Sequence, residues 1–202
     1  MKIVRTETVI AAGAFAKSRQ WKKIRSDLHR EISAVDWPPG SGKFIIYPES
    51  GKKRGQGNGV KPIKGGLIER LKAKGWKPEE RLAVAVTTKP GKLDAVRDTA
   101  NGPVALEWET GNISSSHRAL NKMALGLMKG VLAAGVLVVP SRNLYKFLTD
   151  RVGNFDELEP YLDLWKSIPC AQGVLEIVVI EQDGESTSVS RIPKGTEGRS
   201  MA

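Results

Sequence analysis

Two short and almost entirely apolar runs constrain the fold of this chain more than any other feature. Residues 131–139 contain only Val, Leu, Ala and Gly, and residues 175–180 contain one charged residue among Leu, Ile and Val. Each run is too short for a typical helix and has the composition of a strand that is covered on both faces. Helical patterns lie between such strands, so we expect an α/β fold in which helices flank a central mixed β-sheet.

The other periodic segments fit the same plan. A chain of 202 residues can bury a core without disulfides or metals, and it contains no internal repeat. We therefore expect one domain over residues 1–202, in which residues 185–202 form a C-terminal arm. Further strands are predicted at residues 2–10, 44–47, 82–88 and 104–109, and helices at residues 21–34, 63–74, 114–129, 142–149 and 155–165, the last of which Pro160 can break.

The charge is divided unequally along the chain. Residues 1–92 hold 21 basic and 8 acidic side chains, a net +13, whereas residues 93–202 hold 11 and 14, a net −3. A basic segment attracts a polyanion and releases its counterions, so double-stranded DNA is a candidate partner. Solvated surface lysines explain a basic composition equally well.

Several protein classes are excluded by composition. The single cysteine, Cys170, cannot form an internal disulfide, and two histidines are too few for a structural zinc site. The longest apolar run is about half of the roughly 20 residues that a membrane span requires, and no charged-then-apolar leader is recognisable. We expect a cytoplasmic protein with no membrane partner. Residues 40–43 (GSGK) lack the earlier glycine and the following Ser or Thr of a phosphate-binding loop.

An acidic pair carries the first sign of chemistry. Glu107 and Glu109 are spaced to share one face of a strand, roughly 6.5 Å apart. With a third carboxylate from the preceding segment, Asp94 or Asp98, they would form an oxygen-ligand site suited to Mg²⁺. Such a site can activate water for attack on a phosphodiester. The alternative is a solvated acidic face of an edge strand, which this spacing fits equally well.

Two long strings resemble the family of type II restriction endonucleases typified by BamHI. They are EWETGNISSSHRALNK at residues 107–122 and LTDRVGNFDELEPY at residues 148–161. Shorter matches are NGVKPIK at residues 58–64, the Leu93-Asp94 pair and IPKGTEG at residues 192–198, so the resemblance covers residues 58–198.

The resemblance implies a PD-D/E-x-K nuclease core in which glutamate replaces the usual lysine. Glu109 occupies that position. By analogy Asp94 and Glu107 hold the metals, while Glu109 helps to bind metal and to position or deprotonate the attacking water. Glu79 corresponds to a further active-site carboxylate, although Glu80 is its immediate neighbour.

The resemblance also implies a set of DNA contacts. One group of residues near the start of a predicted helix, and a second pair further along the chain, would read the bases. Arg can bond guanine O6 and N7, Asp can accept from the cytosine amino group, and Asn can contact adenine or an adjacent edge. The alternatives are purely structural roles: a helix cap at Ser114 and a surface ion pair at residues 150–151. The residues carried over are Asn112, Ser114, Arg118, Asp150 and Arg151 for bases, Lys64 and Lys61 for phosphate or the recognition loop, and Glu197 and Gly198 for an arm in the minor groove.

The implied activity is Mg²⁺-dependent cleavage of both strands of the palindrome GGATCC by a homodimer. A palindromic site requires two-fold symmetry, which we assign to helices around residues 118–129 and 155–165. A cognate DNA methyltransferase is expected in the same system, because a host must protect its own sites. The alternatives are a DNA-binding protein without nuclease activity and a metal-dependent DNase of relaxed specificity.

Overall fold

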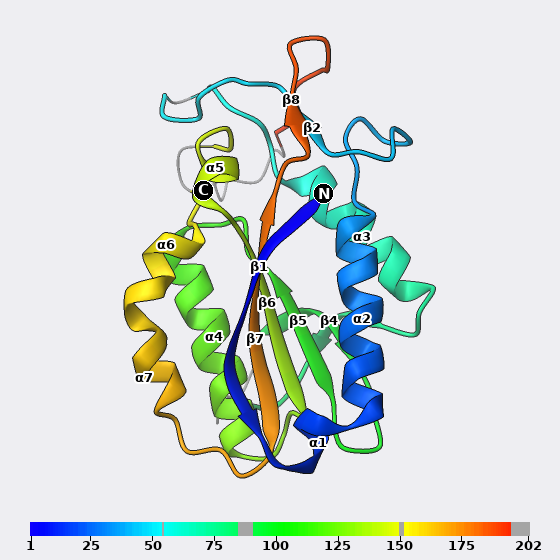
Figure 1. Cartoon of the computed structure of the whole chain (residues 1–202), viewed down its shortest axis with the longest axis vertical. Helices are drawn as coiled ribbons and strands as arrows, with labels where there is room; N and C mark the ends of the chain where they lie inside the picture. Colours follow the sequence, from blue (N-terminus) through cyan, green and yellow to red (C-terminus); the bar gives the residue numbers. More distant parts are fainter. Residues whose placement is uncertain (54, 85–90, 150–151, 195–202) are drawn as a thin grey trace, which may run out of the picture.

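The central element is a six-stranded mixed sheet (Figure 1). The computed structural model describes residues 1–53, 55–84, 91–149 and 152–194. Three neighbouring strands of the sheet, β5, β6 and β7, run parallel, and the other pairings are antiparallel. The spatial order is β1 (Lys2–Ala12), β7 (Gly173–Glu181), β6 (Ala134–Pro140), β5 (Val104–Trp108), β4 (Lys92–Arg97) and β3 (Lys77–Arg81). The predicted α/β class with a mixed sheet is confirmed.

Helices cover both faces of this sheet. In Figure 1 the blue helix α2 stands on one side, whereas α4, α6 and α7 stand on the other. A two-stranded parallel sheet of β2 (Ile45–Ile46) and β8 (Gly184–Glu185) lies at one end of the molecule. The helices are α1 (Gly13–Lys17), α2 (Arg19–Ser33), α3 (Lys61–Lys72), α4 (Ile113–Met128), α5 (Arg142–Tyr145), α6 (Phe155–Leu158), the 3₁₀ turn η1 (Glu159–Tyr161) and α7 (Leu162–Lys166).

The buried apolar side chains form two clusters, one on each face of the sheet, because successive residues of a strand point to opposite faces. Val104, Leu106 and Trp108 of β5 belong to the cluster under α2 and α3, whereas Ala105 belongs to the cluster under α4. All five residues of β5 are buried, because the strand lies inside the sheet and helices cover both of its faces. The alternative of a solvated acidic edge strand is therefore wrong.

The strand predicted at residues 82–88 is also wrong where the structure describes it. Residues 82–84 lie outside any strand, and residues 85–90 lie outside the described residues. Val84 is nevertheless buried, and its carbonyl accepts a hydrogen bond from Lys129 Nζ over 3.1 Å. The actual edge strand, β3, reads Lys-Pro-Glu-Glu-Arg. Within the described part of the chain it pairs with β4 alone and is partly solvated, so it needs no apolar alternation.

The chain after β6 differs from the expectation in length rather than in type. The helix predicted at residues 142–149 ends at Tyr145, since the following segment pairs with the loop around Asn58, whose N–H donates to the carbonyl of Phe147 over 2.8 Å. The helix predicted at residues 155–165 breaks into α6, η1 and α7 around Pro160, as expected.

Part of the segment predicted as an arm packs against the body. Ile192 is buried and donates its N–H to Asn58 Oδ1 over 3.1 Å, and Trp37 Nε1 donates to the carbonyl of Ser190 over 2.8 Å. Among the described residues, none of the helices has the length and apolar character needed to cross a membrane.

Candidate active site

Three carboxylates form a row across the strands β3, β4 and β5. Pro78 and Glu80 pair with Ala95 and Leu93, which places Glu79 opposite Asp94. On the other side of β4, Ala95 pairs with Leu106, and the next residue of each strand is Asp94 and Glu107, which are linked by a hydrogen bond. The register of the sheet thus brings together residues that are far apart in sequence.

Backbone N–H groups of β4 and β5 donate hydrogen bonds to the carboxylates of Asp94 and Glu107. Trp108 donates its N–H to Asp94 Oδ2 over 2.8 Å, and Asp94 donates its own N–H to Glu107 Oε2 over 3.3 Å. Each carboxylate is therefore oriented by the strand that carries the other. This arrangement fixes one oxygen of each residue before any ligand binds.

Lysines from two helices hold the remaining oxygens. Lys64 of α3 donates to Asp94 Oδ1, and Lys122 of α4 donates to Glu107 Oε1 over 2.5 Å. Burial raises the pKa of Glu107, and the ion pair with Lys122 opposes that rise. The row is thus a compact group of charges between the two helical layers.

Glu109 lies one residue beyond the end of β5 and is half-buried. Its N–H donates to the carbonyl of Val138 over 2.9 Å, which keeps the chain along the sheet. Burial and then the charges of Glu107 and Asp94 raise the pKa of Glu109 to about 7. The carboxylates of Asp94, Glu107 and Glu109 therefore lie close enough for their charges to interact.

The two other acidic candidates are more exposed. Glu79 has a left-handed backbone with φ +54° and forms an ion pair with Lys92, which lowers the pKa of the glutamate. Asp98 pairs with Lys77 on the surface, with 62% of its side chain exposed. The structure therefore brings Asp94 and not Asp98 to Glu107, and it places Glu79 at the edge of the row.

The base-reading candidates gather at the start of α4. Asn112 is the N-cap, and its Oδ1 accepts the N–H of Ser115 over 3.1 Å. The cap considered for Ser114 is thus supplied by Asn112, while Ser114 is exposed in the first turn. Arg118 is exposed one turn further and donates to Ser115 Oγ over 3.2 Å. Because β5 leads almost directly into α4, these side chains follow the carboxylates by only a few residues.

The remaining DNA-contact candidates lie outside the described residues. These are Asp150, Arg151, Glu197 and Gly198, together with the side chain of Lys61, whose backbone begins α3. The described residue Gly153 donates its N–H to the carbonyl of Gly111 over 2.8 Å. The described chain just after residues 150–151 therefore lies against the start of α4.

Sequence reasoning assigned no role to Lys122. The signal was present, because Ser114, Arg118 and Lys122 recur every four residues and so share one face of a helix. That spacing alone could not reveal which strand the face would meet.

The donor set fits a hard divalent cation. Asp94, Glu107 and Glu109 offer only carboxylate oxygens, which are the ligands that Mg²⁺ prefers. Their mutual repulsion, expressed in the raised pKa of Glu109, would be relieved by a cation between them. Within the described ranges, no three or more His, Cys, Asp or Glu side chains stand in an arrangement ready to coordinate an ion.

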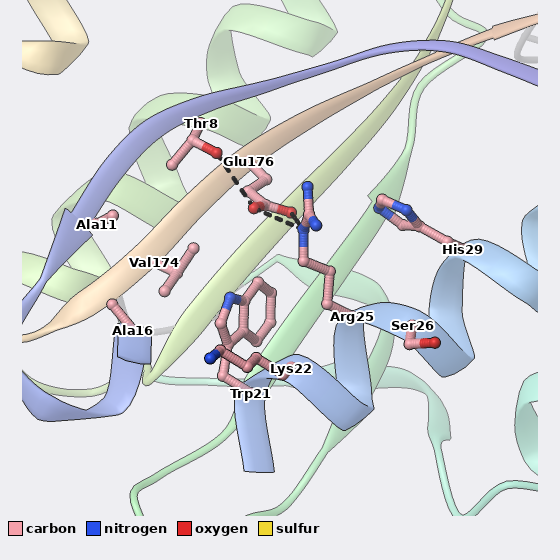
Figure 2. A pocket seen from close by; sticks show the side chains of 10 residues that line it. All are labelled: Thr8, Ala11, Ala16, Trp21, Lys22, Arg25, Ser26, His29, Val174 and Glu176. Carbon is pink, nitrogen blue, oxygen red and sulfur yellow. Dashed lines mark hydrogen bonds and ion pairs between the residues drawn. The ribbon is translucent and has the colours of Figure 1, made fainter. Parts of the chain in front are cut away.

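A second polar cluster lies on the opposite face of the sheet. Figure 2 shows Arg25 of α2 reaching Glu176 of β7, with Arg25 Nε 2.9 Å from both carboxylate oxygens. Thr8 Oγ1 donates to the same carboxylate over 3.3 Å, and these groups line a cavity of about 530 Å³. Its lining contains none of the row carboxylates. The cluster ties α2 to the sheet.

The family model described as "Restriction endonuclease BamHI" matches residues 1–199. The chain belongs to the BamHI family of restriction endonucleases. The family suggested by the two sequence strings is thus confirmed, and the match extends over the first 57 residues, where the resemblance was only loose.

Two relatives support membership of the BamHI family. The type II restriction enzyme OkrAI of Oceanobacter kriegii is 45% identical over 201 residues, which is 100% of each chain. The type II restriction enzyme BamHI of Bacillus amyloliquefaciens is 31% identical over 192 residues, covering 92% of this chain and 86% of that protein.

The fold of this BamHI-family chain also resembles a solved structure. The crystal structure of restriction endonuclease BglII complexed with a DNA 16-mer matches with a TM-score of 0.62 at 10% identity. The match covers 95% of this chain and 88% of that one. At this identity the likeness concerns the fold alone, and it agrees with the restriction-endonuclease-like core expected from sequence.

Proposed function

We propose that this chain is a type II restriction endonuclease that cuts both strands of DNA at GGATCC, as G/GATCC, and leaves 5′-phosphate ends. The observation that carries the proposal is the pairing of Asp94 of β4 with Glu107 of β5 beside Glu109, which lies four residues before the start of α4. Membership of the BamHI family supports the reaction class, and the sequence strings support the target.

Asp94, Glu107 and Glu109 are the proposed ligands of Mg²⁺. When bound, the ion would supply positive charge near the scissile phosphate and make a coordinated water more acidic. Asp94 and Glu107 need little rearrangement, since each already has one oxygen oriented by a backbone N–H. Glu79 is proposed as a further carboxylate at the edge of the site.

Glu109 is proposed to accept the proton of the attacking water at its carboxylate. A general base works best when its pKa lies near the working pH, and in the metal-free protein burial with two carboxylate neighbours places the pKa of Glu109 at about 7. The electron pair of the attacking oxygen forms the new bond to phosphorus, and the 3′ oxygen leaves.

Base reading is proposed for Arg118, Asn112 and Ser114 with Asp150 and Arg151. An exposed arginine on the first turns of a helix can place its guanidinium bidentately on guanine O6 and N7. Phosphate contacts are proposed for Lys64 and Lys61, and minor-groove contacts for Glu197 and Gly198.

A homodimer is proposed through α4 and the α6–α7 segment. Large apolar side chains are exposed there, with Met128 at 48%, Tyr161 at 49% and Leu164 at 63%. The segment is fixed to α4, because His117 packs edge-on against the ring of Tyr161 and Trp165 Nε1 donates to Asn121 Oδ1 over 2.9 Å. Exposed apolar side chains on adjoining helices favour association with a second copy.

The test uses two plasmids, one with a single GGATCC and one with none. In Mg²⁺ the first should be linearised and the second left intact, and sequencing should place the cuts at G/GATCC. Equal cutting of both plasmids would indicate a relaxed DNase, and salt-sensitive binding without cutting in any divalent cation would indicate a binding protein. Protection by a cognate methyltransferase in the same system should block cutting of the first plasmid.

A further inference from the structure

Each carboxylate of the central pair has its oxygens divided between two kinds of partner. Asp94 Oδ2 and Glu107 Oε2 accept backbone N–H groups from the neighbouring strand. Asp94 Oδ1 and Glu107 Oε1 accept lysine ammonium groups, from Lys64 and Lys122. The two lysines therefore occupy the carboxylate oxygens that accept no backbone N–H from these strands, so all four oxygens already have a partner.

The two lysines differ from an ordinary surface ion pair in their surroundings. Glu107 is 7% exposed and Asp94 is 17% exposed at the side chain, so each ammonium compensates a carboxylate that is largely removed from water. The lysines themselves are 22% and 39% exposed for Lys122 and Lys64. Each flexible stem can therefore swing its ammonium toward solvent.

The helix that carries Lys122 also carries the base-reading candidates. Ser114, Arg118 and Lys122 lie on one face of α4 at successive intervals of four residues. The charge of Arg118 acts on Glu109, while Lys122 binds Glu107 and also donates to the carbonyl of Lys92 over 3.1 Å. One helical face thus connects the end that meets DNA with the two glutamates of the site.

We infer that Lys64 and Lys122 are internal counter-cations that keep the metal-binding oxygens closed until DNA is bound. The inference rests on the proposed function and adds positioning roles for two lysines. An ammonium group and a divalent cation compete for the same carboxylate oxygens, whereas DNA phosphate offers each ammonium another anionic acceptor. DNA binding therefore releases the carboxylates to the metal, and the affinities for DNA and metal are positively coupled.

The purely structural role of these ion pairs makes a different prediction. A lysine that only supports the fold would, when removed, lower stability and leave the metal affinity unchanged or weaker. A lysine that blocks the metal would, when removed, raise the metal affinity of the DNA-free protein. Metal affinity without DNA therefore separates the two roles.

The experiment measures Ca²⁺ binding by calorimetry to the full-length, DNA-free protein. The variant Lys64→Met/Lys122→Met should bind Ca²⁺ roughly tenfold or more tightly than the wild type, since two competing cations are gone. Adding a duplex that contains GGATCC should tighten Ca²⁺ binding strongly in the wild type and much less in the double variant. The matched control is Lys77→Met, which removes a lysine from the exposed pair with Asp98 and should leave Ca²⁺ affinity unchanged.

A folding defect in the double variant is handled by a second variant and a second readout. Lys64→Met alone leaves Glu107 paired, and it should raise Ca²⁺ affinity about threefold. Ca²⁺ should also raise the melting temperature of that variant more than that of the wild type. Unchanged or weaker Ca²⁺ binding in the folded lysine variants overturns the inference while the cleavage assay still supports the proposed function. A wild type that binds no divalent cation even with DNA, and does not cut, overturns both.

Discussion

The guanidinium of Arg118 opposes the rise in the pKa of Glu109 that burial and the charges of Glu107 and Asp94 cause. A residue proposed to read a base and a residue proposed to move a proton therefore share one electrostatic environment. This follows from the chain path, because β5 ends at Trp108 and α4 begins at Ile113. Only four residues separate the strand that carries Glu107 from the helix that carries Arg118, so the proposed catalytic and base-reading residues lie close together along the chain.

Replacing the proposed base should stop cleavage and preserve recognition. Glu109→Gln keeps the shape of the side chain but cannot accept a proton at neutral pH, so the single-turnover rate should fall about 10²- to 10⁴-fold. Affinity for a GGATCC duplex should change little when measured by gel shift in Ca²⁺. The control is Glu69→Gln, which changes an exposed glutamate of α3 and should cut normally. Cleavage at the wild-type rate by Glu109→Gln would remove this residue from proton transfer.

The metal-free protein should lose stability as the pH rises toward neutrality. Glu109 has a pKa of about 7 when folded and an ordinary value near 4.5 when unfolded, so the folded state binds more protons between these limits. The free energy of unfolding should therefore fall by roughly 2–3 kcal/mol from pH 4.5 to pH 7 on account of this group. Urea unfolding in EDTA measures this effect as the difference in unfolding free energy between wild type and Glu109→Gln at each pH. The subtraction removes the contributions that the two proteins share. Parallel pH curves for the two proteins would contradict the assignment.

Changing Arg118 should weaken discrimination more than general DNA binding. Arg118→Lys keeps the charge but loses the bidentate fork, so binding to GGATCC should weaken by about 1–3 kcal/mol while affinity for unrelated DNA is kept. Competition binding at fixed salt measures the ratio of the two affinities. Arg19→Lys, in an exposed position on the opposite layer, is the matched control. An equal loss on both DNAs would make Arg118 a phosphate contact instead.

Breaking the ion pair between Arg25 and Glu176 should destabilise the fold without changing the candidate active site. Glu176 is 4% exposed at its side chain, and Glu176→Gln removes the charge that pairs with Arg25 (Figure 2), whose own side chain is 39% exposed and can turn toward solvent. We expect a loss of about 1–2 kcal/mol in the free energy of unfolding, because a hydrogen-bonded ion pair is weakened but no buried charge is left without solvent. The cleavage rate of the folded fraction should stay normal. If Glu176→Gln lowered the free energy of unfolding no more than the exposed variant Glu69→Gln does, the ion pair would contribute little to stability.

A charge on the exposed apolar surface should dissociate the proposed dimer. Leu164 is 63% exposed on α7, and Leu164→Glu should shift the protein to monomers in analytical ultracentrifugation. Double-strand cleavage should fall with the dimer fraction. Ser26→Glu introduces the same charge at an exposed position on α2 and should not change the sedimentation. A Leu164→Glu protein that sediments as a dimer would place the interface elsewhere.

Much of the fold was predictable because its local signals are strong. The apolar runs of β6 and β7 and the spacing of α2 and α4 predict buried strands and amphipathic helices from the sequence alone. The polar edge strand β3 was missed, since a strand that pairs on one side and faces solvent shows no apolar alternation. Residues 82–84 were predicted as part of a strand and are not one, because burial of Val84 against α4 does not require strand geometry.

The sequence by itself determined the family, and it identified the acidic pair Glu107 and Glu109 and the candidate base-reading residues at the start of α4, because these lie in one continuous string. Only the tertiary structure shows why Asp94, which the resemblance had favoured over Asp98, is the residue that meets Glu107, since backbone N–H groups of β4 and β5 donate to the two carboxylates. It also decided that Lys122 meets Glu107, because a helix face acquires its partner only when the helix packs on the sheet. Local patterns fix which face of an element is apolar, whereas contacts between distant residues are set by strand register and helix packing.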